Sequence, residues 1–370
     1  MKHIFLLGAL LTMTGCAGAG LHVPEGSQLE EDLLRVGRAD VAWSGDAERL
    51  VVGGEDPFVF EVASGRKISL GRSPVNRVAF SPAGDVVAAV VYGDDGEHIA
   101  IFNVNGQQQS TQPMSGRTTG LAWKDDNSVV WSSMELEKFG FGGNLKTWLS
   151  VWSIKETTVK STLIADNTLN TRLTEGIDLA IANGLDNLAV GPYRDECMIS
   201  HYVDPPLFPP YINVTVRRFS DTSNHLSVKA DFDSSRVFPG TDGDSIWIKR
   251  DQELRRFDRW SGKELQSMLL DGNNFAVAPG SGLVWDGRNL HRGEQVIGPI
   301  VADRLLFSPD GAKAAVVKSG MLSILNGLAS AAPFSAAFDV EKMVKLRSWR
   351  AQKLISHEEY LELKRKLLKP

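Results

Sequence analysis

The 370-residue sequence predicts an all-β fold: a seven-bladed β-propeller, with six or eight blades as alternatives, followed by a short C-terminal α-helical hairpin. Two observations predict the propeller. A strand–turn–strand motif recurs along the chain, and its copies are spaced as propeller blades are. A third observation, a change of composition near Asp339, predicts the helices. A β-sandwich, which is also built from short strands and turns, is the alternative fold.

The repeated motif is an apolar run that ends in an aromatic residue, a turn, and a second apolar run. The turns are rich in Ser, Pro, Asp and Gly, which fix or tolerate turn dihedrals. The flanks are rich in Val, Ala, Phe and Trp, as buried strands are. The clear copies begin at Val41, Val78, Leu121 and Leu305, and the first two intervals are about 37 and 43 residues. Propeller blades repeat at roughly 40–45 residues, so each copy fits one blade.

Each copy is followed by further strand-like runs, such as "FVFEVASGRKI" at 58–68, so one unit is predicted to contain four antiparallel strands. Between 164 and 240 the copies align poorly, and we expect blades four to six to open within 177–193, 226–240 and 273–287. Leu29 to Val36 is expected to complete the last blade, which places the propeller at 29–334. Gly84 and Gly311 are expected in hairpin turns, because glycine accepts positive φ.

The turns Phe80–Gly84 and Phe307–Gly311 resemble the "FSPDG" turns of WD-repeat proteins, and this resemblance covers most of Asp40 to Leu325. The resemblance implies a β-propeller. The sequence departs from the family in lacking its Gly-His dipeptide, and it has a single Trp-Asp dipeptide, at Trp285-Asp286. The Ser-Gly-Arg and Ser-Gly-Lys turns at 64–66 and 261–263 are similar to those of quinoprotein-type propellers.

The N-terminus is typical of an exported and anchored protein. Lys2 precedes an apolar core, Ile4 to Met13, that is too short to span a bilayer and suits a secretory signal. The stretch Met13 to Cys16 resembles the bacterial lipobox, which implies cleavage before Cys16 and lipid attachment to it. We therefore expect a lipoprotein signal peptide at 1–15 and a lipidated cysteine with a tether at 16–28. An ordinary signal with a chance cysteine is the alternative.

Residue 17 is Ala, not the Asp that retains lipoproteins in the inner membrane of enteric bacteria, so the resemblance favours the outer membrane, facing the periplasm. The net charge of −5 and an exported location argue against a nucleic-acid partner. The chain has two cysteines, and lipidation of Cys16 would leave Cys197 without a disulfide partner. We expect Cys197 to be a small buried hydrophobe.

From Asp339 onward glycine disappears, and Leu, Lys, Glu and Arg dominate, as in helices. Ser356 and Glu359 form a capping box that begins the second helix. Two helices this short cannot bury enough surface alone, so they must meet the propeller, a second copy or a partner. The hairpin shares no strand with the propeller, and its deletion is therefore predicted to spare the propeller. The first helix is marked by apolar residues at helical spacing, at Val340, Met343, Val344 and Leu346.

The segment 339–370 resembles the SHOCT domain, a short C-terminal domain of many bacterial proteins. The matching residues include Leu346-Arg347, the stretch Leu354 to Tyr360, Lys364 and Leu367-Leu368. The resemblance implies oligomerisation or docking without catalysis, including self-association through the hairpin. Leu354 and Leu367 are the predicted partner-binding residues of this segment. A helix pair that merely closes the propeller is the alternative.

The sequence carries no strong catalytic motif: no Gly-x-Ser-x-Gly elbow, no phosphate-binding loop and no Cys-x-x-Cys. The seven histidines lack metal-ligand spacing, and "TDGDS" at 241–245 reads as a turn in preference to a calcium loop. We therefore predict that the protein is not an enzyme and holds no cofactor or metal.

The loop "DPPLFPPYI", Asp204 to Ile212, leaves the sheet because proline cannot donate to a strand ladder. Leu207, Phe208 and Tyr211 are its predicted partner-binding residues, since exposed apolar groups mark contacts. A loop folded back over the propeller is the alternative. Together these features predict a membrane-anchored lipoprotein whose propeller is an interaction scaffold for envelope proteins. The alternative function is a quinoprotein-like or lactonase-like propeller that uses its central channel for catalysis or ligand binding.

Overall fold

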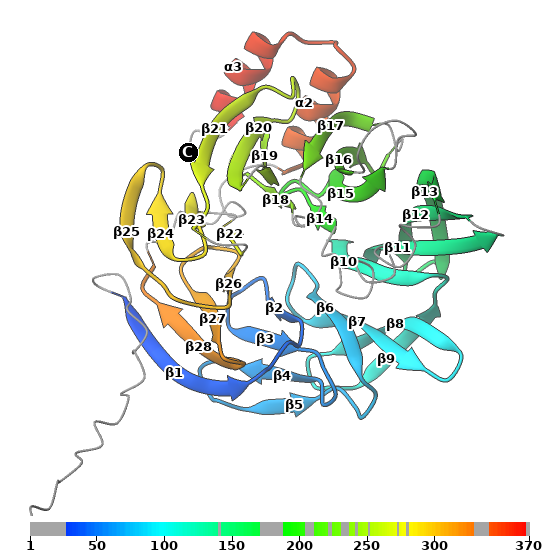
Figure 1. Cartoon of the computed structure of the whole chain (residues 1–370), viewed down its shortest axis with the longest axis vertical. Helices are drawn as coiled ribbons and strands as arrows, with labels where there is room; N and C mark the ends of the chain where they lie inside the picture. The colour runs from blue at the N-terminus through cyan, green and yellow to red at the C-terminus, as the bar shows by residue number, and fades with distance from the viewer. Residues whose placement is uncertain are drawn as a thin grey trace, which may run out of the picture.

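Seven four-stranded antiparallel sheets are arranged around a common centre, as Figure 1 shows for the computed structural model of the chain. The prediction of a seven-bladed propeller is confirmed. The structure describes residues 27–139, 142–170, 188–203, 211–220, 224–230, 237–240, 243–250, 252–271, 274–278, 281–328 and 340–367.

The first three blades follow the chain in order, each with its first strand innermost. Their strands are β2 (Val41–Trp43), β3 (Arg49–Val52), β4 (Phe58–Glu61) and β5 (Lys67–Ser69); β6 (Val75–Phe80), β7 (Val86–Gly93), β8 (Gly96–Asn103) and β9 (Gln108–Pro113); and β10 (Arg117–Asp125), β11 (Ser128–Phe139), β12 (Gly142–Ser153) and β13 (Thr158–Asn170). All three opening strands overlap the repeat copies found in the sequence.

Blades four to six continue the same pattern. Their strands are β14 (Leu188–Val190), β15 (Glu196–Val203), β16 (Tyr211–Arg218) and β17 (Asn224–Ala230); β18 (Val237–Pro239), β19 (Ser245–Arg250), β20 (Glu253–Asp258) and β21 (Glu264–Leu269); and β22 (Ala276–Val277), β23 (Leu283–Trp285), β24 (Asn289–Arg292) and β25 (Gln295–Pro299).

One expected boundary needs correction. The stretch 226–240 was expected to open blade five, but its first part, in β17, is the outer strand of blade four, and β18 opens blade five. The sequence between the two strands, residues 231–236, is rich in Asp and Ser like the hairpin turns, so the pattern predicted a single copy of the motif across the two strands and the connection between the blades.

The seventh blade combines the two ends of the propeller. It consists of β26 (Arg304–Phe307), β27 (Ala314–Lys318), β28 (Met321–Asn326) and the N-terminal strand β1 (Gln28–Arg35). Strand β1 pairs antiparallel with β28, with Leu29 opposite Leu325 and Arg35 opposite Met321. The expected role of Leu29 to Val36 is therefore confirmed, and the ring closes through strand pairing of distant segments.

Buried apolar residues fill the spaces between neighbouring blades, and indole groups bridge them. The Trp43 Nε1 donates to the Leu306 carbonyl at 3.0 Å, and the Trp123 Nε1 donates to the Ala79 carbonyl at 3.0 Å. Cys197 is fully buried in such a cluster, and burial raises the pKa of its thiol to about 12. The expectation that Cys197 acts as a buried hydrophobe is confirmed.

The hairpin turns have the predicted glycine chemistry. Gly84 lies between β6 and β7 with φ 76°, and Gly311 lies between β26 and β27 with φ 72°. Both positions are in the left-handed region, where a Cβ costs energy. The copies of the motif assigned to blades two and seven are therefore aligned correctly.

The C-terminal segment forms the predicted helical hairpin, with α2 (Val340–Ala351) and α3 (His357–Leu367). The capping box is present: the Glu359 N–H donates to Ser356 Oγ at 3.1 Å, and the Ser356 N–H donates to Glu359 Oε2 at 2.7 Å. The two helices lie against blades four and five (Figure 1). Neither helix within the described residues is long and apolar enough to cross a bilayer.

Candidate functional site: the hairpin dock

Three turns of blades four and five meet the helical hairpin at one end of the propeller. In an antiparallel four-stranded blade, the first and third connections leave the sheet at the same end. The β14–β15 and β18–β19 turns therefore lie at the same end as the β20–β21 turn. They supply three carboxylates, one arginine and two aromatic rings, and we call this set with its hairpin partners the hairpin dock. Its propeller residues are Tyr193, Asp195, Glu196, Asp244, Arg259 and Trp260.

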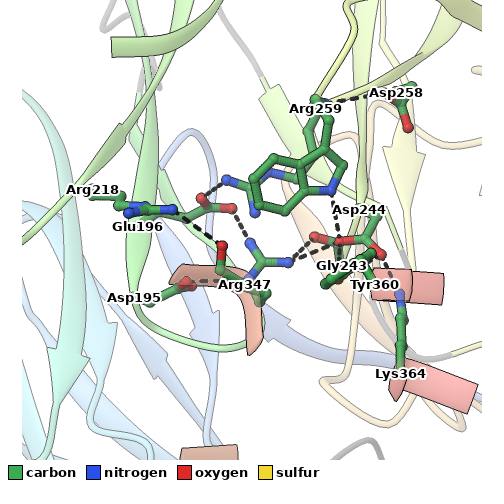
Figure 2. Close-up of polar contacts among 11 residues, drawn as sticks. Asp195, Glu196, Arg218, Gly243, Asp244, Asp258, Arg259, Arg347, Tyr360 and Lys364 are labelled. Carbon is green, nitrogen blue, oxygen red and sulfur yellow. Dashed lines mark hydrogen bonds and ion pairs between the residues drawn. The ribbon is translucent and has the colours of Figure 1, made fainter. Parts of the chain in front are cut away.

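Arg347 of α2 inserts its guanidinium among these carboxylates (Figure 2). Its Nε donates to Asp195 Oδ2 at 3.1 Å, and its Nη2 donates to Glu196 Oε1 at 2.6 Å. Its Nη1 donates to Asp244 Oδ1 at 3.0 Å and to the Gly243 carbonyl at 2.7 Å. All three guanidinium nitrogens are thus used, in the planar fork geometry that arginine has and lysine lacks.

Aromatic rings enclose the same guanidinium. The Arg347 Cζ lies 4.5 Å from the centre of the Tyr193 ring and 5.7 Å from that of Trp260. Cation–π attraction at such distances adds to the ionic contacts, most where water is excluded. Arg347 is 0% exposed, so the guanidinium is removed from solvent and every contact acts at low dielectric.

A second arginine belongs to the propeller. Arg259 pairs with Glu196 Oε2, so the Glu196 carboxylate bridges one arginine of the propeller and one of the hairpin. Both members of the Arg259–Glu196 pair are almost completely buried, at 1% and 0% exposed. Arg259 also stacks on Trp260, with its Cζ 4.1 Å from the ring centre. Contacts among propeller residues alone therefore position the Glu196 carboxylate.

Asp244 joins the dock to the second helix. The Tyr360 hydroxyl donates to Asp244 Oδ1 at 2.7 Å, and the Lys364 ammonium pairs with Asp244 Oδ2. The Trp260 Nε1 donates to Asp244 at 3.3 Å. Asp195, Glu196 and Asp244 thus pair with Arg347, Arg259 and Lys364. A further buried cation, Arg218 of β16, donates its Nη2 to the Arg347 carbonyl at 3.2 Å (Figure 2).

The protonation states of the hairpin residues follow from this arrangement. Burial alone would lower the pKa of Arg347, but the carboxylates of Asp195 and Asp244 outweigh it and raise that pKa, so the side chain stays charged. Burial and the adjacent Asp244 carboxylate raise the pKa of Tyr360 far above its ordinary value, so its hydroxyl remains a donor.

An apolar cluster lies beside the charges and completes the dock. Tyr193 of the propeller packs with Met343, Leu346 and Tyr360 of the hairpin, and all four are at most 3% exposed. The Trp260 and Tyr360 rings meet edge to face, with centres 5.7 Å apart. The sequence left open whether the helices meet the propeller, a second copy or a partner, and the structure shows the propeller.

The residues predicted as sites lie mostly elsewhere. Cys16, Leu207 and Phe208 fall outside the described residues. Tyr211 begins β16, half-buried, with Lys229 Nζ 4.2 Å above its ring. Leu367 packs half-buried against the hairpin cluster, whereas Leu354 lies between the helices and is 65% exposed. Roles of these residues toward a partner stay predictions.

Sequence reasoning missed the propeller half of the dock. Arg347, Tyr360 and Lys364 were part of the SHOCT-like pattern, but nothing indicated which carboxylates they would meet. Of the "TDGDS" stretch, 243–245 lie within the described residues, and the Gly243 N–H donates to the Gly240 carbonyl at 3.0 Å, as in a turn. The missed signal is that Gly191 and Gly240 stand where blades one, two and seven have serine, next to turns that contain acidic residues.

Comparisons with known proteins agree with this architecture. A family model described as "Eukaryotic translation initiation factor eIF2A" matches residues 26–165. The β-propeller domain of Cps50 (Swd1) from Myceliophteria thermophila superposes with a TM-score of 0.54 at 12% identity, covering 80% of this chain and 98% of that one. A chain of the Mitotic Checkpoint Complex gives 0.52 at 11% identity, covering 89% and 99%. No curated protein matches the sequence.

The fold and the comparisons define the class of the protein: a WD-repeat-like seven-bladed β-propeller with a C-terminal helical hairpin. At 11–12% identity the solved structures establish the fold alone.

Proposed function

We propose that the protein is a membrane-anchored lipoprotein whose propeller acts as a protein–protein interaction scaffold in the bacterial cell envelope. The observation that supports this most is the hairpin dock. One end of the propeller binds a helical element through buried ion pairs, aromatic rings and an apolar cluster. Those are the features of an interface between protein surfaces.

The proposed location rests on the N-terminal sequence. The short apolar core and the lipobox-like Met13 to Cys16 support export and lipidation at Cys16. Ala17 after the cysteine supports an outer-membrane position facing the periplasm. The tether before β1 would then hold the propeller near the membrane, and envelope proteins would be its partners.

The anchor is tested by Cys16→Ala. The variant should leave the membrane fraction and should no longer incorporate a palmitate analogue, because the acyl chains are attached to that residue and its amine. Cys197→Ala is the matched control and should remain membrane-bound. A Cys16→Ala protein that still sediments with membranes and takes up the label would contradict lipidation.

The scaffold role is tested by crosslinking the native protein in cells and identifying the crosslinked peptides by mass spectrometry. Reproducible links between defined propeller surfaces and the same envelope proteins would support it. Links spread evenly over abundant proteins would argue against it. We propose a non-catalytic role without cofactor; a central-channel enzyme would instead require turnover of a small substrate by the purified chain.

A further inference from the structure

We infer that the propeller half of the hairpin dock is an exchangeable arginine-recognition site, and that Arg347 is its resident ligand. An arginine on a helix of a partner protein would enter the same site when the hairpin leaves. This inference rests on the proposed scaffold function and names the chemistry of its partner. It is carried by three observations: the site is formed by the propeller itself, it selects arginine, and the hairpin fills it with few residues.

The propeller forms the site without help from the hairpin. The β14–β15 turn is closed by a backbone bond from Gly191 to Glu196 at 3.0 Å, and the β18–β19 turn by one from Gly240 to Ser245 at 2.7 Å. Glu196 is held in place by Arg259, which is itself stacked on Trp260. The ring of blades closes through β1 and β28, far from these turns. The carboxylates therefore keep their positions when the hairpin is absent.

The geometry selects arginine over lysine. Three nitrogens of one guanidinium reach three carboxylates in three directions, while Tyr193 and Trp260 contact its faces. An ammonium is a point charge without a planar face, so a lysine at this position cannot reach Asp195, Glu196 and Asp244 together. Loss of both Arg347 and Lys364 would remove the two hairpin cations that pair with Asp195, Glu196 and Asp244 and would leave the propeller cations Arg259 and Arg218, so the site would favour an incoming cation.

The hairpin contributes few residues to the dock. In α3 the buried residue among those described is Tyr360, and in α2 the buried residues are Met343, Leu346 and Arg347. A competing helix needs the same short pattern, an arginine with apolar residues one and four positions before it. Helix elements with this little buried surface open locally at a smaller free-energy cost than a blade does.

A foreign helix can gain contacts that the hairpin leaves unused. Strand β21 follows the Trp260 turn directly. Its Leu265 and Leu269 are 49% and 74% exposed, on an outer strand of blade five. Any separate partner loses association entropy on binding, and a second copy's hairpin would offset it only with the contacts that the resident hairpin already makes, whereas a different helix can add contacts to β21. We therefore assign the site to a different protein.

The test uses the full-length Arg347→Ala variant and a fluorescent synthetic peptide with the sequence of residues 340–367. Fluorescence anisotropy should show the peptide binding this variant at least ten-fold more tightly than the unmodified chain, whose site is filled. A peptide with Lys in place of the arginine should bind at least ten-fold more weakly. Asp195→Asn with Asp244→Asn, added to the variant, should abolish binding. Equal binding of the Arg and Lys peptides, or none to a folded variant, would overturn the inference.

A second measurement on the unmodified chain remains informative even if the variant misfolds. The α2 amides should show hydrogen exchange at least ten-fold faster than the β15 amides. Equal exchange rates would mean that the hairpin leaves the propeller only on global unfolding, and that result would overturn the inference. A concentration-dependent dimer that Arg347→Ala abolishes would assign the site to a second copy and overturn the partner assignment. These outcomes are measured on purified protein, so they are distinguishable from failure of the in-cell crosslinking.

Discussion

The first turn of blade two and the first turns of blades four and five are closed by the same backbone hydrogen bond, but their acidic residues bind different partners. In blade two, Ser81 Oγ accepts from the Val86 N–H at 3.2 Å and donates to Asp85 at 2.9 Å. In blades four and five, glycine replaces that serine, and the aspartates at the position of Asp85 are Asp195 and Asp244. Freed from a serine partner, both bind the hairpin.

This difference teaches how a repeat acquires a binding site without changing its fold. The backbone bonds that define the turn are kept: Ser81 to Val86 at 2.8 Å in blade two and Gly191 to Glu196 at 3.0 Å in blade four. Removal of one hydroxyl releases a carboxylate that is already at the end of the propeller. A buried carboxylate must be paired, so the released aspartates require the cations of the hairpin.

The largest loss of hairpin docking free energy is expected from Arg347→Ala. The change leaves Asp195, Glu196 and Asp244 without their shared partner, and removal of one member of a buried ion pair typically costs about 3–5 kcal/mol. We expect the hairpin to detach, with the free energy of undocking reduced by about 3 kcal/mol. Hydrogen exchange of α2 and α3 measures this directly.

Arg350→Ala is the control, because Arg350 lies in the same helix outside the ion pairs of the dock. It should change exchange of the hairpin little. Deletion of the hairpin, which the sequence predicts to spare the propeller, should leave exchange of the blade amides, including those of the β14–β15 turn, unchanged. An Arg347→Ala hairpin that exchanges as slowly as the unmodified one would show that the apolar cluster alone holds it.

A smaller loss is expected from Tyr360→Phe. The change keeps the ring that packs on Trp260 and removes the hydroxyl that donates to Asp244 at 2.7 Å. Hydrogen bonds to charged groups contribute about 1.5–3 kcal/mol, so we expect about 2 kcal/mol less docking free energy. Urea unfolding followed through α-helical circular dichroism measures it, and Tyr211→Phe serves as the control outside the dock. Identical unfolding of Tyr360→Phe and the unmodified chain would show that the hydrogen bond from Tyr360 to Asp244 contributes nothing measurable to the docking free energy.

Gly191→Ser tests the turn comparison itself. A Cβ at Gly191 would lie 3.1 Å from Glu196 Cγ. Either the Glu196 side chain must therefore move away from Arg347, or the backbone at residue 191 must shift. Overpacking of this size costs at least about 1 kcal/mol, and we expect that loss in the hairpin dock with the blade intact. The measurement is again exchange of the α2 amides. The reverse change, Ser81→Gly in blade two, should leave the hairpin unaffected; a stabilised dock in Gly191→Ser would refute the proposed role of the glycine.

The fold could be predicted from the sequence because each blade repeats its own local signals. The turns around Gly84 and Gly311 identify blades two and seven, and the 40-residue spacing makes a ring of blades the natural arrangement. The border between blades four and five was missed because the Asp- and Ser-rich sequence between β17 and β18 resembles a hairpin turn within one blade. Short apolar runs carry no information on which sheet they join.

The sequence predicted the hairpin residues of the site but not their partners on the propeller. Helical spacing and the capping box placed Tyr360 and Arg347 on a hairpin, since these signals act within a few residues of the chain. Their partners are 103 to 152 residues away in sequence, and only the three-dimensional ring brings them together. A comparison of the turns with one another would have identified Gly191 and Gly240 as departures, because the repeat defines what each position normally holds.

The smallest effect, and a different kind of test, is expected at Asp286 in blade six. Its carboxylate is used within its own turn, like that of Asp85: it accepts the Asn289 N–H at 2.6 Å and pairs with His291 Nε2 at 2.6 Å. Burial opposes ionisation, but these bonds outweigh it and lower the pKa of Asp286 below its ordinary value of 3.8. A lowered carboxyl pKa stabilises the folded state fully above the ordinary value, and that stability is lost as the pH falls through the lowered pKa.

The melting temperature of the unmodified chain should therefore fall more steeply than that of Asp286→Asn as the pH drops below about 3.8, while the two curves run parallel above it. Thermal melts across this range measure the difference, and Asp271→Asn, which alters an exposed acid of the same region, should follow the unmodified chain. Parallel curves at every pH would mean that an acid satisfied within its own turn contributes nothing to acid stability, and the contrast with the acids of the hairpin dock would then rest on packing alone.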